Sequence, residues 1–190
     1  MDSNYILDKT FEQRIFDSAN IMHTDFERCV FTDCDLSACD YLGTSFTDCD
    51  FRSCNFEEAK INYVAFRSAK FTDCNFTNVN FAMVDKLFFD IEFHGCKLNY
   101  AKFYTLQLKQ TLFTDCTILA ADFMDANLKQ AIFDNCDLYK SVFHNSDLSG
   151  CDFTTSFNFS INPEKNKMKK AKFSRDGLKG LLEKFDLVVK

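Results

Sequence analysis

The sequence is poor in the residues that usually make tight turns. Its 190 residues include one proline, five glycines and no tryptophan. Because glycine and proline dominate the common tight turns, a fold with many corners has to form them with other residues. No stretch approaches 18 consecutive apolar residues, so no ordinary membrane-spanning helix is expected.

Signals for export and for catalysis are missing as well. The N-terminus has no basic region followed by an apolar run, so we expect a cytoplasmic protein whose ten cysteines are reduced thiols. No glycine-rich phosphate loop, Gly-x-Ser-x-Gly or His-Glu-x-x-His occurs, and His23, His94 and His144 are dispersed. We therefore expect neither an enzyme nor a cofactor, and no direct binding of membranes or nucleic acid.

What the chain has in abundance is phenylalanine, at 24 residues, placed with a period of five. A large apolar residue, here called the centre, recurs at every fifth position from Phe16 to Phe81, and again, two residues out of phase, from Phe88 to Phe153. A period of five fits neither an α-helix nor a straight strand, because residues five apart point in different directions in both. The chain must turn a corner once per repeat, as a solenoid does.

Columns of identical residues twenty apart give the number of sides. Phenylalanine fills one such column throughout, after allowance for the two-residue offset: Phe31, Phe51, Phe71, Phe93, Phe113, Phe133 and Phe153. Four sides of five residues make a square coil, and successive coils stack at a strand spacing of about 4.8 Å. The sequence thus predicts an all-β solenoid of about seven or eight coils with this column in its core.

The position two before each centre is nearly always small, as a narrow square interior requires. All ten cysteines occupy it: Cys29, Cys34, Cys39, Cys49, Cys54, Cys74, Cys96, Cys116, Cys136 and Cys151. A Cys-x4-Cys spacing is wider than metal sites normally use, and neighbouring thiols fall on different walls of the coil. Stacked thiols point in parallel, which disfavours disulfides. We interpret the cysteines as core residues and expect no metal site.

These repeats resemble the pentapeptide-repeat family, whose unit is A(D/N)LXX with Cys and Phe common at the inward positions. Cys136-Asp137-Leu138, Ala126-Asn127-Leu128 and Cys49-Asp50-Phe51 fit this unit, and the resemblance covers residues 16 to 158. It implies a right-handed quadrilateral β-helix. Some members, including the quinolone-resistance group, bind DNA gyrase as DNA mimics; others have no known activity. Gyrase-binding members can carry longer loops than this chain has.

The ends depart from the repeat, so we predict a single domain of four parts. Residues 1–18 are expected to form an N-terminal cap, 19–158 the repeat body with a two-residue insertion within 82–87, 159–173 a distorted last coil, and 174–190 a helix and tail. Ser174 is a suitable N-cap for that helix. Its apolar residues recur at helical spacing: Leu178, Leu181, Leu182 and Phe185. They could cap the last coil or form a homodimer interface, and of the two we expect a homodimer.

Function has to lie on outward residues such as Asp33, Asp35 and Asp40, for which two interpretations remain open. Acidic residues directly before a centre are Asp25, Asp35, Asp40, Asp50, Asp122, Asp137, Asp147 and Asp152. They could solubilise the rod and bond its corners, or they could form an acidic surface that imitates DNA. The repeat body is acidic, whereas residues 154–190 carry a formal charge of +5. Candidates for exposed apolar contact are Leu87, Phe89, Tyr104, Leu112 and Ile132.

The sequence therefore predicts a rigid, non-catalytic, protein-binding rod, with DNA gyrase as the specific partner implied by the resemblance. A scaffold for an unrelated partner is the alternative hypothesis.

Overall fold

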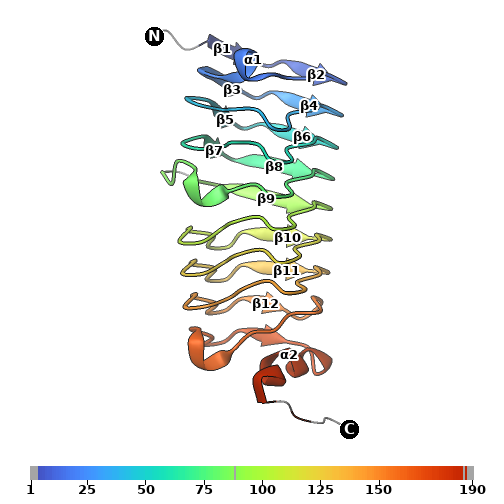
Figure 1. Cartoon of the computed structure of the whole chain (residues 1–190), viewed down its shortest axis with the longest axis vertical. Coiled ribbons are helices and arrows are strands. Elements are labelled where there is room, and N and C mark those ends of the chain that lie inside the picture. Colours follow the sequence, from blue (N-terminus) through green and yellow to red (C-terminus); the bar gives the residue numbers. More distant parts are fainter. Residues whose placement is uncertain (1–3, 88, 186, 188–190) are drawn as a thin grey trace.

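The computed structural model describes residues 4–87, 89–185 and 187. These residues form a four-sided parallel β-solenoid of about eight turns with one short C-terminal helix (Figure 1). The chain visits the sides in a fixed order within each coil, and we number them first to fourth in that order. The square coil predicted from the period of five is thus confirmed. Residues 1–3, 186 and 188–190 of the predicted cap and tail, and the centre Phe88, lie outside the described residues.

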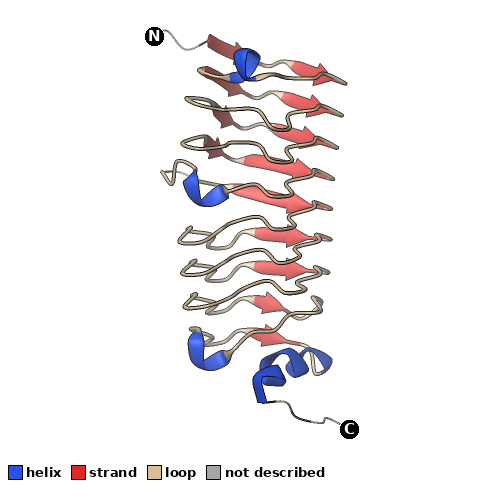
Figure 2. Ribbon diagram, viewed as in Figure 1, coloured by secondary structure: helices blue, strands red, loops and turns tan. Residues whose placement is uncertain are grey.

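Parallel sheets cover the first two sides, as the strands in Figure 2 show. The first side carries four strands: β1 Asn4–Leu7, β3 Thr24–Glu27, β5 Ser45–Thr47 and β7 Ala65–Arg67. The second side carries nine: β2 Thr10–Glu12, β4 Val30–Thr32, β6 Asp50–Arg52, β8 Ala69–Thr72, β9 Ile91–His94, β10 Leu112–Thr114, β11 Ile132–Asp134, β12 Asp152–Phe153 and β13 Lys172–Phe173. Isolated parallel bridges such as Asp35↔Asn55 and Asp40↔Lys60 join the coils on the third and fourth sides.

The corners are made by left-handed residues that are mostly not glycine. Among the described residues, twenty-five non-glycine residues have a positive φ, between 48° and 64°, and three glycines do so too. All of them except Asn158 lie at the second position after the centre, as in Ala38 and Lys140. Left-handed backbone costs of order 1 kcal/mol or more for such residues. Most corners are held by the next coil, because the amide of the corner residue bonds a carbonyl there; the Ala38 N–H donates to the Glu57 carbonyl at 2.9 Å.

Phenylalanine rings stacked along the axis fill the core. Phe51 is fully buried and stacks on Phe31 and Phe71, with ring centroids 4.7 and 4.9 Å away. Its edge contacts Phe46 and Phe56 of the adjoining sides at 5.1 and 5.3 Å. Offset-stacked and edge-to-face rings are the favoured aromatic arrangements. The predicted column from Phe31 to Phe153 therefore lies in the core, with every member 1% exposed or less.

One coil contains two extra residues. Strand β8 pairs with β9 at a sequence offset of 22, as in Phe71↔Phe93, whereas the strands on either side pair at 20. The chain forms a 3-10 turn, η1 Phe81–Met83, with Asn80 as its N-cap; it is the green helical turn midway along the rod in Figure 1. The Leu87 N–H then bonds the Asp85 carboxylate at 2.8 Å. The two extra residues therefore lie on the fourth side and in the corner that follows it.

The first coil, residues 4–22, already has the geometry of the others. Strands β1 and β2 pair with β3 and β4, and the helix α1 Ser18–Ile21 forms the fourth side. Arg14 occupies an inward position where the repeat has a small residue. Its guanidinium carbon lies 5.7 and 5.3 Å from the ring centroids of Phe11 and Phe16. The N-terminal segment is therefore a coil in shape, with an arginine over the end of the core.

At the other end, the last coil contains the 3-10 turn η2 Pro163–Lys165 and the strand β13. Helical turns follow without a break as η3 Asp176–Leu178, α2 Lys179–Leu182 and η4 Glu183–Phe185. The Ser174 hydroxyl accepts the Gly177 N–H at 3.0 Å, which begins this helical segment where the sequence predicts it. None of the described helices is long and apolar enough to cross a membrane.

Candidate protein-binding surfaces

The eight carboxylates predicted as an acidic surface are not brought together. The structure places two on each side of the rod: Asp25 and Asp147 on the first, Asp50 and Asp152 on the second, Asp35 and Asp137 on the third, and Asp40 and Asp122 on the fourth. Positions five apart in the chain fall on different sides, so acids that share a repeat position are scattered. As a set, they do not form one surface.

Most of these carboxylates instead hold the corner that follows them. Asp35 accepts the Ser37 N–H at 3.1 Å and the Ser37 hydroxyl at 2.7 Å. The serine hydroxyl in particular keeps the pKa of Asp35 below its ordinary value, although burial acts in the opposite direction. The same bond to the amide two residues later is made by five others: Asp40, Asp122, Asp137, Asp147 and Asp152. These side chains are turn-forming residues of the coil.

A different set of carboxylates does gather on one side. We call acidic sheet face the carboxylates on the nine strands of the second side or in the turn directly after each: Glu12, Asp33, Asp50, Asp73, Glu92, Asp115, Asp134 and Asp152. Three basic residues lie on the same strands. Each is next to a carboxylate, with nitrogen to oxygen distances of 3.3 Å (Arg52–Asp50), 3.9 Å (Lys70–Glu92) and 2.9 Å (Lys172–Asp152). The face keeps an excess of negative charge along the rod.

Three members of this face are suited to contact a partner. Asp33, Asp73 and Asp115 are exposed, occupy the left-handed turn position in coils along the rod, and take part in none of the ion pairs found among the described residues. Reasoning from the sequence named Asp33 among the outward residues but missed Asp73 and Asp115, because it followed the position before the centre instead of the turn position after it. The signal was present as an aspartate column on either side of Ser53 and Gly95.

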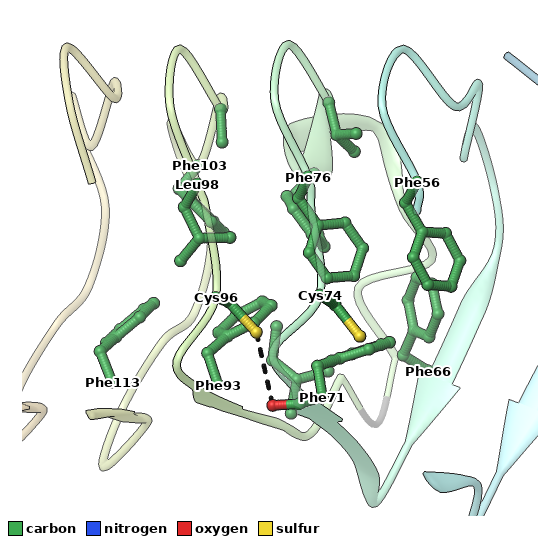
Figure 3. Packing of buried hydrophobic residues seen from close by; sticks show 14 of the residues in the cluster. Phe56, Phe66, Phe71, Cys74, Phe76, Phe93, Cys96, Leu98, Phe103 and Phe113 are labelled. Atoms are coloured by element: carbon green, nitrogen blue, oxygen red, sulfur yellow. Dashed lines mark hydrogen bonds between the residues drawn. The ribbon is translucent and has the colours of Figure 1, made fainter. Parts of the chain in front are cut away.

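All ten cysteines are buried and free, and their thiols do more than fill space. Each thiol lies within hydrogen-bond reach of a backbone carbonyl of the preceding coil. The Cys96 Sγ is 3.4 Å from the carbonyl oxygen of Phe71, which Figure 3 shows as a dashed line. Ser146 and Ser156 make the same bond with their hydroxyls at 2.7 and 2.8 Å. The small inward position therefore also supplies a donor to a buried carbonyl.

Burial limits the reactivity of two of the inward thiols. Burial raises the pKa of Cys49 and Cys151 to about 12, which keeps both thiols protonated and poorly nucleophilic at neutral pH. Within the part of the chain that the structure describes, no three His, Cys, Asp or Glu side chains are grouped so that they could hold a metal ion. His23 and His144 are exposed, and His94 lies 3.8 Å from Glu92.

The C-terminal helical segment contacts the last coil through glycine. A Cβ on Gly180 would lie 2.1 Å from the carbonyl oxygen of Phe159, and one on Gly177 would lie 2.9 Å from its ring. The Ile161 N–H donates to the Gly180 carbonyl at 2.9 Å. Among the four predicted helix residues, Leu181 packs against the core, whereas Leu178, Leu182 and Phe185 are 47%, 37% and 52% exposed. One face of the segment covers the rod and the other stays open.

Exposed apolar residues also form a row at the corner after the fourth side. We call apolar ridge the five exposed residues Leu42, Tyr63, Met83, Leu87 and Met124 together with the half-buried Tyr104; the set lies in five successive coils. The Tyr63 N–H donates to the Met83 carbonyl at 2.8 Å, so these two ridge residues are neighbours in adjacent coils. Of the apolar residues singled out in the sequence, Leu87 and Tyr104 belong to this ridge. Leu112 and Ile132 lie on the second side, paired in register.

Comparisons with known proteins agree with this architecture. A family model described as "Pentapeptide repeat region" matches residues 86–157, and one described as "Pentapeptide repeats (8 copies)" matches residues 29–62. No curated protein sequence matches the chain. A trypsin-treated form of QnrB1, described as a plasmid-mediated fluoroquinolone resistance protein, is similar in structure. It is 17% identical, with a TM-score of 0.50, and the match covers 99% of this chain and 98% of that one.

A second similar structure is HetL from the cyanobacterium Nostoc, a pentapeptide repeat protein involved in heterocyst differentiation regulation. It is 14% identical with a TM-score of 0.32, and the match covers 90% of this chain and 86% of that one. At these identities the likeness concerns the fold alone. The two family models together match more than half of the residues, on the same fivefold repeat that builds the coils. The chain belongs to the pentapeptide-repeat family.

Proposed function

We propose that this protein is a non-catalytic rod that binds a basic protein surface through its acidic sheet face, and that the partner is the DNA-binding surface of a type II topoisomerase such as DNA gyrase. The observation that carries this proposal is the excess of carboxylates on the second side, eight against three bases. Folding does not require this excess, because the turn positions of Asp33, Asp73 and Asp115 accept Ser, Gln and Asn in other coils.

The charge density of the acidic sheet face shows how much of a DNA duplex it could imitate. Eight coils at about 4.8 Å span roughly 38 Å, a length over which duplex DNA carries about 22 phosphate charges. The acidic sheet face has far fewer, so it would replace a short run of phosphates along one edge of a duplex. A row of a few lysines or arginines is the matching partner surface. The QnrB1 description as a fluoroquinolone resistance protein favours a topoisomerase as the owner of that surface.

Homodimerisation through the C-terminal helix would double this face, and the structure offers an apolar surface for it. Pro163, Leu178, Leu181, Leu182 and Phe185 line a shallow groove of about 430 Å³ beside Glu164 and Lys184. Because the glycine face of the helix already contacts the last coil, the open apolar face is free to pack on a second copy. We propose that the protein is a homodimer joined at this end.

The test is a supercoiling assay with purified gyrase, with and without a fluoroquinolone. We expect the protein at micromolar concentration to inhibit supercoiling or to protect it from the drug. The triple variant Asp33→Lys, Asp73→Lys, Asp115→Lys should lose at least about tenfold in potency. It should fold, because Lys140 and Lys170 occupy the same left-handed turn position with φ of 59° and 63°.

A control variant with the same change in net charge shows whether potency depends on the position of the carboxylates or only on the net charge of the protein. Glu57→Lys, Glu58→Lys and Asp125→Lys reverse three carboxylates on the third and fourth sides. We expect this variant to keep wild-type potency. Absence of both inhibition and protection would reject the topoisomerase proposal, and equal losses in the two variants would reject the acidic sheet face as the site. A scaffold for an unrelated partner, favoured by the turn-forming role of the scattered carboxylates, would then be the better hypothesis.

A further inference from the structure

The apolar ridge lies away from the acidic sheet face and is not used by the proposed function. Five of its six residues are exposed on a rod whose core is already filled: Tyr63 is 67% exposed, Leu87 63%, Leu42 44%, Met124 40% and Met83 37%. The sixth, Tyr104, is half-buried. Monomeric soluble proteins rarely expose contiguous apolar rows, and methionine is common on surfaces that bind helices of varied sequence. The ridge therefore has the composition of a docking surface.

A row of charged residues runs beside the ridge on the fourth side. The residues directly before each centre are, coil by coil, Asp40, Lys60, Asn80, Lys102 and Asp122. Parallel bridges Asp40↔Lys60, Asn80↔Lys102 and Lys102↔Asp122 show that they are axial neighbours. The row reads the same in both directions: negative, positive, neutral, positive, negative. Neither lysine belongs to an ion pair among the described residues.

This symmetry argues against a second copy of the chain as the occupant. Two copies packed ridge to ridge about a two-fold axis at Asn80 would set Lys60 against Lys102 and Asp40 against Asp122. A parallel arrangement, with the two-fold axis along the rod, would put the two rows on opposite flanks of the interface, where they do not face each other. The antiparallel arrangement therefore opposes like charges directly, which is unfavourable, and the parallel one leaves both lysines without an acidic partner from the row. The complementary partner instead carries two acidic residues that face the lysines.

The axial spacing matches an α-helix lying along the rod. Coils repeat at about 4.8 Å and helical turns at about 5.4 Å, so a helix offers one apolar residue per turn to one ridge residue per coil. Lys60 and Lys102 are two coils apart, about 9.6 Å, close to the roughly 10.5 Å between helix positions i and i+7. The ridge from Leu42 to Met124 spans four coil steps, about 19 Å, or about 13 helical residues.

We infer that the apolar ridge binds an amphipathic α-helix of a partner protein, with its apolar stripe on the ridge and two acidic residues seven positions apart facing Lys60 and Lys102. Binding of a helix by its apolar stripe is a common mode of peptide recognition.

The experiment uses fluorescein-labelled, end-capped 16-residue peptides and fluorescence anisotropy. The probe carries leucines at i, i+4, i+7 and i+11 and two glutamates seven apart along one edge of that stripe. A second peptide has lysine in place of these glutamates, and a third is a scramble of the first. We expect saturable binding of the glutamate peptide and at least about tenfold weaker binding of the other two.

Variants of the full chain locate the site. Tyr63→Ser with Met83→Ser should weaken binding about tenfold, whereas Tyr100→Ser with Tyr139→Ser, which removes exposed rings from other corners, should leave it unchanged. Lys60→Glu with Lys102→Glu should reverse the preference from the glutamate to the lysine peptide. The inference is overturned by no saturable binding at millimolar peptide, by equal effects of the two serine pairs, by unchanged peptide preference, or by sedimentation showing that the ridge variants change the oligomeric state.

Discussion

Removing the ring of Phe51 tests the stacked core. Phe51 is fully buried and contacts four rings, at centroid distances of 4.7, 4.9, 5.1 and 5.3 Å. Truncation of a buried phenylalanine to alanine costs about 3–5 kcal/mol, and each lost aromatic pair adds to the area term. We expect Phe51→Ala to lower the free energy of unfolding by about 5 kcal/mol, a large part of the total stability of a typical domain.

Phe173 supplies the comparison within the same column. It lies at the C-terminal end of the rod, is only partly buried, and has one stacked partner, Phe153 at 5.3 Å, and one tilted partner, Phe159 at 5.5 Å. Truncation of Phe173 removes fewer contacts than truncation of Phe51, so we expect Phe173→Ala to lower the free energy of unfolding by about 2 kcal/mol. Phe51→Leu should cost less than Phe51→Ala, because leucine fills other centre positions, including Leu36 and Leu138, without exposure.

The measurement is urea unfolding followed by far-ultraviolet circular dichroism, because the chain has no tryptophan to report by fluorescence. With an m-value of about 2 kcal/mol/M, the expected loss at Phe51 corresponds to a fall in the urea midpoint of roughly 2.5 M. The reasoning is refuted if Phe51→Ala loses no more than Phe173→Ala, because central and terminal rings would then contribute equally.

Three further predictions concern the chain end and the thiols. Gly180→Ala should displace the helix from Phe159 and speed proteolysis after residue 174, whereas Lys179→Ala should not. Leu182→Glu with Phe185→Glu should halve the mass by light scattering, and an unchanged mass would reject the dimer interface. Folded Cys49 and Cys151 have a pKa of about 12, so as the pH rises their thiols ionise in the unfolded chain before they ionise in the folded one. Their ionisation does not affect stability below about pH 9. Between pH 9 and 12 it lowers the free energy of unfolding by up to about 1.4 kcal/mol per pH unit for each thiol. Urea midpoints at pH 7, 9 and 10.5 should therefore fall less in Cys49→Ala with Cys151→Ala.

The positions of the inward-facing residues could be predicted from the sequence because these residues recur with a regular period. Two of every five residues face the core, and their sizes alone give the square coil and the phenylalanine column. The same argument identified the cysteines as core residues, although it did not reveal that their thiols bond carbonyls of the preceding coil. That bond depends on the offset between adjacent coils, which spacing along the chain does not express.

The roles of the outward-facing residues could not be predicted in the same way. Asp35 and Asp33 are two residues apart and chemically identical, yet one bonds a turn amide and the other is exposed beyond the strand end. The C-terminal helix gave a similar problem. Its apolar spacing predicted one face, whereas contact with Phe159 runs mainly through Gly177 and Gly180. Glycine is selected there for close approach, a property that hydrophobic spacing does not detect.

Two surfaces on one rod imply that two partners could be bound at once. Residues ten apart in the chain lie on opposite sides of a four-sided coil, so Asp73 on the second side and Met83 on the fourth are separated by the full width of the core. Each coil of a solenoid contacts only its neighbours, and stacked rings leave little room for a change on one side to move the other. Substitutions on distant, independent sites have additive effects. The acidic triple variant should therefore retain full binding of the glutamate peptide. The ridge variants should retain any effect that the wild-type protein has on gyrase. Loss of both activities in either variant would mean that the two surfaces are parts of a single site.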